Sequence, residues 1–236
     1  MESTTAAEER PASGTARARR PRAATAERRE EILSAAMRTF GSRGYHNGSL
    51  AEVAEQVGIT HAGVLHHFGS KDRLLIAVLE FRDRVDVEHL EGQHIPEGLE
   101  LFRHLVRTAR MNEDRPGIVQ AYTAITGESV TDGHPAAEWV TERFRVLRES
   151  IGTALSEVAA ERSVEVDLDR ATLDRAASAI IGVMDGLQSQ WLLDPEAVRL
   201  ADSTAFAIEA IMSATLAGSA RATLPLAQPE EHTGDS

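Results

Sequence analysis

Apolar residues recur three and four positions apart along most of the chain, which is the spacing of one buried helical face. The first such stripe comprises Ile32, Leu33, Ala36, Met37 and Phe40 and predicts a helix over 25–43. Glycine and proline interrupt the pattern repeatedly. Beyond the first helix the spacing predicts helices starting near residues 49, 60 and 70, the last running to about 90, and then at 97–112, 116–130, 135–162, 168–193 and 196–219. Only 164–168 alternates like a strand, and it is short, so the sequence predicts an all-α fold.

Signals for helix starts are densest between Ser49 and Leu75. Ser49 followed by Glu52 forms a capping box, in which the hydroxyl and the carboxylate each bind a free amide at the helix start. Gly58 ends that helix, and Thr60 begins a second short one. Two short helices joined by a glycine turn are typical of a helix-turn-helix, whose second helix enters a DNA major groove. Spacing alone is equally consistent with a helical hairpin inside an ordinary core.

This stretch resembles the DNA-binding segment of the tetracycline-repressor (TetR) family. The most specific part is His67-Phe68-x-Ser70-Lys71. The remaining matches are Leu50-Ala51, Val53-Ala54, Val57-Gly58, Gly63 to Phe68, and Leu74-Leu75. Extended back to Arg28, the resemblance covers about a quarter of the chain without gaps.

The resemblance implies an N-terminal three-helix helix-turn-helix domain followed by a C-terminal helical domain for ligand binding and dimerisation. With the breaks in the helical pattern, it predicts a DNA-binding domain at 25–75, a connecting helix and loop at 76–95, and an effector-binding and dimerisation domain at 96–220. The flanking segments 1–24 and 221–236 have no apolar periodicity, so we expect a disordered basic arm and a disordered tail.

Charge is distributed unevenly along the chain. The formal net charge is -12, yet the segment from Arg10 to Gly48 holds nine arginines and three acids. Residues 71–236 hold 16 basic and 29 acidic side chains. A basic end and an acidic remainder are what we expect when one end of a protein faces phosphate.

Helix N-termini bind phosphate through free amides and the helix dipole. The starts at Ser49 and Ser70 offer this, and the resemblance implies that His67 and Lys71 also contact phosphate. Leu65 departs from the family, where tyrosine is usual; it either packs on a thymine methyl or is buried. His61 either donates to a base or bonds to phosphate or water. The predicted DNA-binding residues are Ser49, Thr60, His61, Ala62, Gly63, Leu65, His66, His67 and Lys71.

Two further sites are predicted in the C-terminal domain. The effector pocket is assigned to Met111, Tyr122 and Trp139, with the alternative that all three are plain core. No arginine or acid stands out there, so the sequence favours an uncharged, largely hydrophobic effector. An apolar stripe on the last two helices is assigned to a dimer interface, or alternatively to intrachain core, and comprises Ala176, Ile180, Val183, Met184, Leu187, Trp191, Phe206 and Ile211.

Other classes of chemistry find little support. Cysteine is absent, and His66 and His67 are adjacent on a helix and therefore diverge, so we expect no metal site and no cofactor. No apolar run has the length of a membrane span, and no signal peptide begins the chain, so a cytoplasmic protein is expected. No nucleophile elbow or phosphate-binding glycine loop occurs.

The sequence therefore predicts a transcriptional regulator that binds a double-stranded, palindromic operator as a homodimer. The resemblance implies a repressor that a small-molecule effector releases. The alternative is an all-helical enzyme, or a partner-binding protein whose helical hairpin does not contact DNA.

Overall fold

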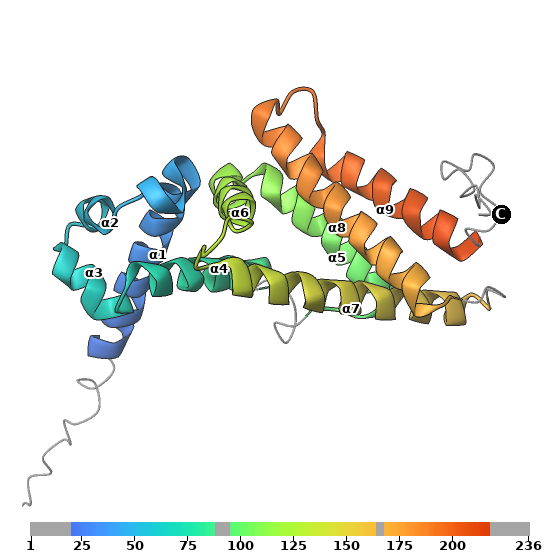
Figure 1. The fold of residues 1–236 in the computed structure, drawn as a ribbon, viewed down its shortest axis with the longest axis horizontal. Coiled ribbons are helices and arrows are strands. Elements are labelled where there is room, and N and C mark those ends of the chain that lie inside the picture. Colours follow the sequence, from blue (N-terminus) through green and yellow to red (C-terminus); the bar gives the residue numbers. More distant parts are fainter. Residues whose placement is uncertain (1–19, 88–94, 164–167, 218–236) are drawn as a thin grey trace, which may run out of the picture.

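The computed structural model describes residues 20–87, 95–163 and 168–217, and these residues form helices and no strands (Figure 1). The all-α prediction is confirmed. The helices are α1 (Arg20–Asn47), α2 (Leu50–Gln56), α3 (His61–Phe68), α4 (Lys71–Val87), α5 (Gly98–Glu113), α6 (Pro116–Glu128), α7 (Ala137–Glu161), α8 (Arg170–Leu193) and α9 (Leu200–Ala217). The tail at 221–236, the arm up to residue 19 and the strand-like 164–167 lie outside the described residues.

Helix α1 is longer than predicted at both ends. It begins at Arg20 rather than Thr25, because a proline in the first helical turn needs no amide partner. Residues 20–24, assigned above to a disordered arm, are therefore helical. At the other end the predicted turn begins at Gly44, whose φ of 73° breaks the helical backbone even though helical turns continue to Asn47.

The N-terminal core is built from α1 to α4 together with α6 and the start of α7 (Figure 1). Phe40 and Val64 are fully buried in this core, and so is Ile125 of α6. Helix α1 crosses α6 closely at Gly41, where an added Cβ would lie 3.0 Å from the backbone nitrogen of Ala121. Two helices from the predicted effector domain, α6 and the first turns of α7, thus contribute to the same core as the helix-turn-helix.

The rest of the molecule is a bundle of α5, α7, α8 and α9 (Figure 1). Its core includes Leu155 and Ile180, which are fully buried. Helix α9 begins at Leu200 rather than 196, since the Asp194 carboxylate accepts the Ala197 amide at 3.1 Å and holds the intervening residues in a turn.

Helix α9 differs from expectation in one respect. Among the described residues it is the helix long and apolar enough, by length and composition, to cross a membrane, with a mean hydropathy of 1.2. A helix in the core of a bundle can pass the same test. Ile208 and Met212 are buried against α5 and α8, so α9 is a bundle helix in this fold.

Candidate functional site

The predicted capping box opens helix α2. The Glu52 amide donates to Ser49 Oγ at 3.1 Å, and the Ser49 amide donates to Glu52 Oε2 at the same distance. Two otherwise unpaired groups are thereby satisfied at the start of a helix of only 7 residues. Leu50, Val53 and Ala54 are buried, which fixes the helix against the core.

The turn between α2 and α3 also has the predicted chemistry. Gly58 has a φ of 67°, a conformation that disfavours other residues. Thr60 Oγ1 then accepts the Gly63 amide at 3.1 Å and caps α3. Helices α2 and α3 pack against each other, and α3 packs against α4, at the end of the molecule remote from the bundle (Figure 1).

Helix α3 presents one buried face and one exposed face. Val64 and Phe68 are buried in the N-terminal core, whereas His61, Ala62 and His66 are exposed. Gly63, Leu65 and His67 lie between, half-buried. Leu65 packs against the core, which fits the burial alternative better than the thymine contact. The exposed polar side chains available to read a base edge are therefore the two histidines, at positions 61 and 66.

Arginines of α1 hold the helix-turn-helix in place. Arg28 donates to the Val57 carbonyl at 3.1 Å, and Arg29 donates to the His67 carbonyl at 2.9 Å. Arg29 also lies 4.1 Å from the centroid of the Phe68 ring. Both carbonyls belong to the last turns of α2 and α3, where a helix leaves acceptors unpaired. Part of the basic charge assigned above to phosphate binding thus stabilises the motif itself.

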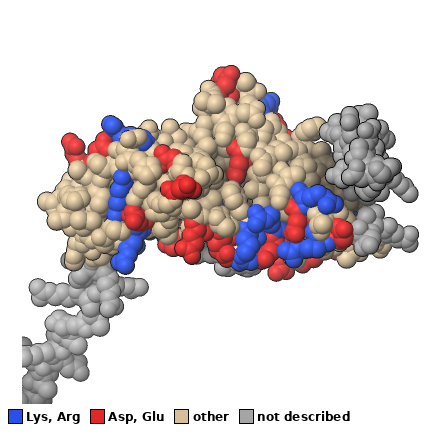
Figure 2. All heavy atoms as spheres, viewed as in Figure 1, with Lys and Arg blue, Asp and Glu red and all other residues tan. Residues whose placement is uncertain are grey.

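The surface in Figure 2 carries a stripe of basic side chains near the N-terminal end and acidic side chains over the middle of the molecule. Further towards the C-terminal end, basic and acidic side chains lie side by side. The acidic middle disfavours DNA there, and the basic stripe on this face near the N-terminal end favours phosphate.

Lys71 lies in a cluster that the sequence did not reveal. Its Nζ donates to the His46 carbonyl at 3.3 Å and lies 4.5 Å from the centroid of the Tyr45 ring. The Tyr45 hydroxyl donates to Asp72, and the Tyr45 amide donates to Glu128 Oε2 at 2.6 Å. Burial raises the pKa of Tyr45, and the hydrogen bond to Asp72 adds to that effect, so the phenol stays a neutral donor.

This cluster joins the helix-turn-helix to α6. Glu128 lies at the end of α6, and its carboxylate is 3.7 Å from the Nε2 of buried His134. Burial lowers the pKa of His134 despite that carboxylate. The sequence signal for this cluster was a glycine followed by an aromatic residue in the turn at the end of α1. Only a glycine at position 44 leaves room for the Glu128 side chain.

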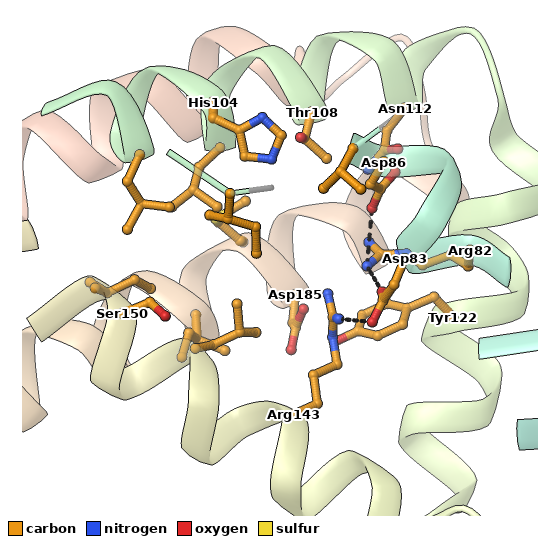
Figure 3. Close-up of a pocket in the computed structure, with 18 of the residues that line it drawn as sticks. Arg82, Asp83, Asp86, His104, Thr108, Asn112, Tyr122, Arg143, Ser150 and Asp185 are labelled. Atoms are coloured by element: carbon orange, nitrogen blue, oxygen red, sulfur yellow. Dashed lines mark hydrogen bonds and ion pairs between the residues drawn. The ribbon is translucent and has the colours of Figure 1, made fainter. Parts of the chain in front are cut away.

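A cavity of about 500 Å³ lies between α4, α5, α6, α7 and α8 (Figure 3). Tyr122 is in its wall, as predicted for an effector pocket, but Met111 and Trp139 do not line it. Trp139 packs against the N-terminal core instead. Met184, assigned above to a dimer interface, lines the cavity. Neighbouring apolar positions on α8 face the cavity, the bundle core or the surface. An apolar stripe in the sequence does not show which position faces which of these.

The cavity wall is rich in charge, contrary to the expectation that no arginine or acid stands out. Arg82 Nη1 lies 2.9 Å from Asp83 and 3.1 Å from Asp86, and Arg143 pairs with the other oxygen of Asp83 (Figure 3). Arg115 contacts Asp86 at 2.5 Å. Burial acts to lower the pKa of Arg82, but Asp86 and Asp83 outweigh it and raise that pKa. One signal in the sequence could have revealed this network. Helix α4 changes from apolar to charged residues after Phe81, and the charged part lies opposite the bundle.

The residues assigned to a dimer interface divide into three groups. Ala176, Ile180 and Trp191 are buried within the chain, so for them the core alternative is correct. Ile211 is half-buried against the bundle core. Val183, Leu187 and Phe206 line a shallow surface groove between α8 and α9, where Phe206 is 75% exposed. The exposed positions of α8 near this groove include Ala179 and Gly182 rather than large apolar residues.

The capped helix-turn-helix and the helical bundle with its internal cavity define a helical DNA-binding protein. Residues 32–78 match the family model described as bacterial regulatory proteins, tetR family. The match spans the helix-turn-helix and parts of the helices on either side of it, and identifies this part of the chain as a tetR-family DNA-binding region.

Three relatives show how far the likeness extends. The transcriptional repressor AcnR of Corynebacterium jeikeium is 29% identical over 66% of this chain and 81% of its own length. The regulator TtgR of Pseudomonas putida is 29% identical over 77% of this chain and 88% of its own. SmeT, the repressor of the Stenotrophomonas maltophilia multidrug efflux pump SmeDEF, shares the fold with a TM-score of 0.63, at 19% identity, over 79% of this chain and 89% of its own. SmeT has also been solved as a triclosan complex.

Proposed function

We propose that this chain is a cytoplasmic transcriptional repressor that binds a palindromic operator as a homodimer and is released by a small molecule. The observation that carries the proposal is the exposed face of α3 on a motif whose helix caps are complete. AcnR is named as a repressor and TtgR as a regulator, and neither name describes an enzyme.

The contact of Lys71 with DNA is part of this proposal. Its ammonium lies beside the start of α4, where free amides and the helix dipole favour a phosphate. Lys71→Ala removes one phosphate contact, so we expect weaker binding to every DNA sequence and a salt slope lower by about one unit. A gel shift over a range of salt, with DNA flanking the gene as probe, measures both. A change in the preferred sequence would contradict a phosphate role.

The homodimer is proposed to form through α8 and α9. Small exposed residues such as Ala179 and Gly182 allow two helices to approach closely, and exposed Phe206 supplies apolar area. Phe206→Glu should weaken association, which sedimentation measures as a shift from dimer to monomer. Val130→Glu, at an equally exposed apolar residue in the loop after α6, is the matched control. An intact Phe206→Glu dimer would place the interface elsewhere.

The release mechanism follows from where the cavity lies. Its wall includes Arg82, Asp83 and Asp86 of α4, the helix that begins directly after the helix-turn-helix. A ligand that prefers one position of α4 shifts the population towards that position. SmeT is a repressor solved with a small molecule bound, and we infer a comparable ligand response here.

A further inference from the structure

The cavity has an apolar end and a polar end. On α5, Leu101 and Leu105 precede Thr108 and Asn112, and on α8 Met184 precedes Gln188. Helix α7 runs the opposite way, because the start of α5 meets its last turns, where the Gly98 amide donates to Glu157 at 2.8 Å. Arg143 accordingly comes before the apolar lining residues of α7. The apolar end is lined by Leu101, Leu105, Leu147, Ile151, Ile181 and Met184. A cavity divided in this way fits a molecule with an apolar body and a polar head group.

Each arginine at the polar end already has a carboxylate partner. The Nε atoms of Arg82 and Arg143 have no hydrogen-bond partner among the described residues, but both atoms are buried. Arg82 contacts both Asp83 and Asp86, and Arg143 contacts Asp83 (Figure 3). An anionic head group would have to displace one of these carboxylates, leaving it buried without its partner. Losing one partner of a buried pair is strongly unfavourable. The polar end is therefore poorly suited to an anion.

Asp185 is the exception among the charged groups of the wall. Its side chain points into the cavity beside Arg143 (Figure 3), yet no ion pair or hydrogen bond joins it to any residue that the structure describes. Burial raises the pKa of Asp185, and the charges of Arg143 and Arg82, which form no ion pair with it, only partly oppose that rise. A carboxylate in this position gains most from a cation or an N–H donor.

Three other side chains of the cavity wall also offer acceptors. Asn112, Gln188 and Thr108 are 2%, 6% and 8% exposed. The side-chain oxygens of all three have no hydrogen-bond partner among the described residues. Buried acceptors left unpaired destabilise a protein, so a ligand that brings N–H groups gains binding energy from each. A primary ammonium carries three such donors and no acceptor.

We propose that the cavity binds an amphipathic organic cation, with its apolar body at the leucine-lined end and a protonated amine at Asp185. The inference rests on the proposed function in that this cation is the effector that releases DNA. The volume of about 500 Å³ lies within the ordinary range for small-molecule sites. Asp185 sets the charge preference, and the buried oxygens of Asn112, Gln188 and Thr108 are further acceptors for the amine.

The test compares three head groups on one tail. Octylamine, 1-octanol and octanoate are titrated into the full-length protein by calorimetry at pH 7. We expect octylamine to bind tightest and octanoate weakest. Asp185→Asn should weaken octylamine binding by about tenfold to a hundredfold, the range of a charge-assisted hydrogen bond, and leave 1-octanol binding within about twofold. Asp174→Asn, on the same helix but outside the cavity, is the control and should change neither.

Tighter binding of octanoate than of octylamine, or an unchanged octylamine affinity in Asp185→Asn, would overturn the proposal. Circular dichroism checks that Asp185→Asn is folded, as the near-isosteric exchange predicts. The proposed function is tested separately by a gel shift without ligand. Asp185-dependent octylamine binding by a protein that binds no DNA would support the cation site and refute the regulator.

Discussion

The helix-turn-helix and the cavity use polar side chains over very different distances in the sequence. In the helix-turn-helix, the caps at Ser49 and Thr60 each bind an amide three residues further on. In the cavity, Arg115 reaches Asp86 across 29 positions, and Arg143 reaches Asp83 across 60. The first region can therefore be recognised in a short stretch of sequence. The second exists only after several helices have packed together.

The largest effect is expected where this long-range network is broken. Arg82→Met removes the cation between buried Asp86 and half-buried Asp83, while Asp86 keeps Arg115 and Asp83 keeps Arg143. We therefore expect a loss of about 3 kcal/mol in the free energy of unfolding, the lower end of the range for breaking a buried ion pair. Urea unfolding measures it. The neighbouring Arg84, which is half-exposed, is the control, and Arg84→Met should change stability by no more than about 0.5 kcal/mol. Equal effects of the two variants would show that the network is not structural.

The next effect concerns specificity in the helix-turn-helix. His61 is exposed at the start of α3, and one hydrogen bond from it to a base is worth about 1–3 kcal/mol of discrimination. His61→Ala should therefore flatten the preference at one base pair of each half-site, with stability unchanged. Binding selection from a randomised operator measures this. A uniform loss over all positions would instead mean that His61 contacts the backbone.

A smaller effect tests the local caps. Ser49→Ala removes the hydroxyl that accepts the Glu52 amide, and a lost N-cap costs about 1 kcal/mol of stability. Thermal unfolding detects this as a lower Tm. Ser213→Ala, at an exposed serine inside α9, provides the comparison and should leave Tm unchanged. If Ser49→Ala has the Tm of the wild type, the caps do not stabilise this motif.

The smallest effect is a dependence on pH. Because burial raises the pKa of Asp185 above its unfolded value, the folded state binds the extra proton. The charged carboxylate therefore lowers the stability of the wild type by its full amount above the folded-state pKa, and does not lower it below the unfolded-state pKa. Asp185→Asn lacks this penalty, so its stability advantage should grow as pH rises through that interval. Denaturant unfolding at a series of pH values measures the difference, and a constant difference would contradict it.

What could be predicted from the sequence follows from the same contrast. Helix periodicity, the capping box and the glycine of the turn depend on residues within about one or two turns of each other, so they were predictable. Tyr122 was assigned to the pocket from its residue type alone. Asp185 could not be assigned to the pocket from the sequence, because an acid on a helix is ordinarily solvated. Only the packing of α8 against α6 and α7 places it in the cavity wall.

The dimer assignment was wrong for its buried residues for a related reason, and for its exposed residues it stays a prediction. An apolar stripe shows that a helix face is covered but does not show what covers it. Ile180 and Trp191 proved to be covered by the same chain, whereas Phe206 is 75% exposed. Small residues such as Gly182, which lie beside the stripe, mark the exposed face better than the large ones do.

The close crossing of α1 and α6 matters for anyone who wishes to alter the ligand of this protein. Ala121 meets Gly41 of α1, while the adjacent Tyr122 stands in the cavity wall. A biosensor with a new input can be made by replacing cavity side chains at the leucine-lined end, such as Leu105 of α5, Leu147 of α7 and Ile181 of α8, because these residues are not part of the N-terminal core. Replacing Gly41 or Ala121 with anything larger would force the two helices apart. Designs should therefore keep Gly41 and Ala121 unchanged, so that α6 keeps its contact with α1 and can still transmit ligand binding to the DNA-binding domain.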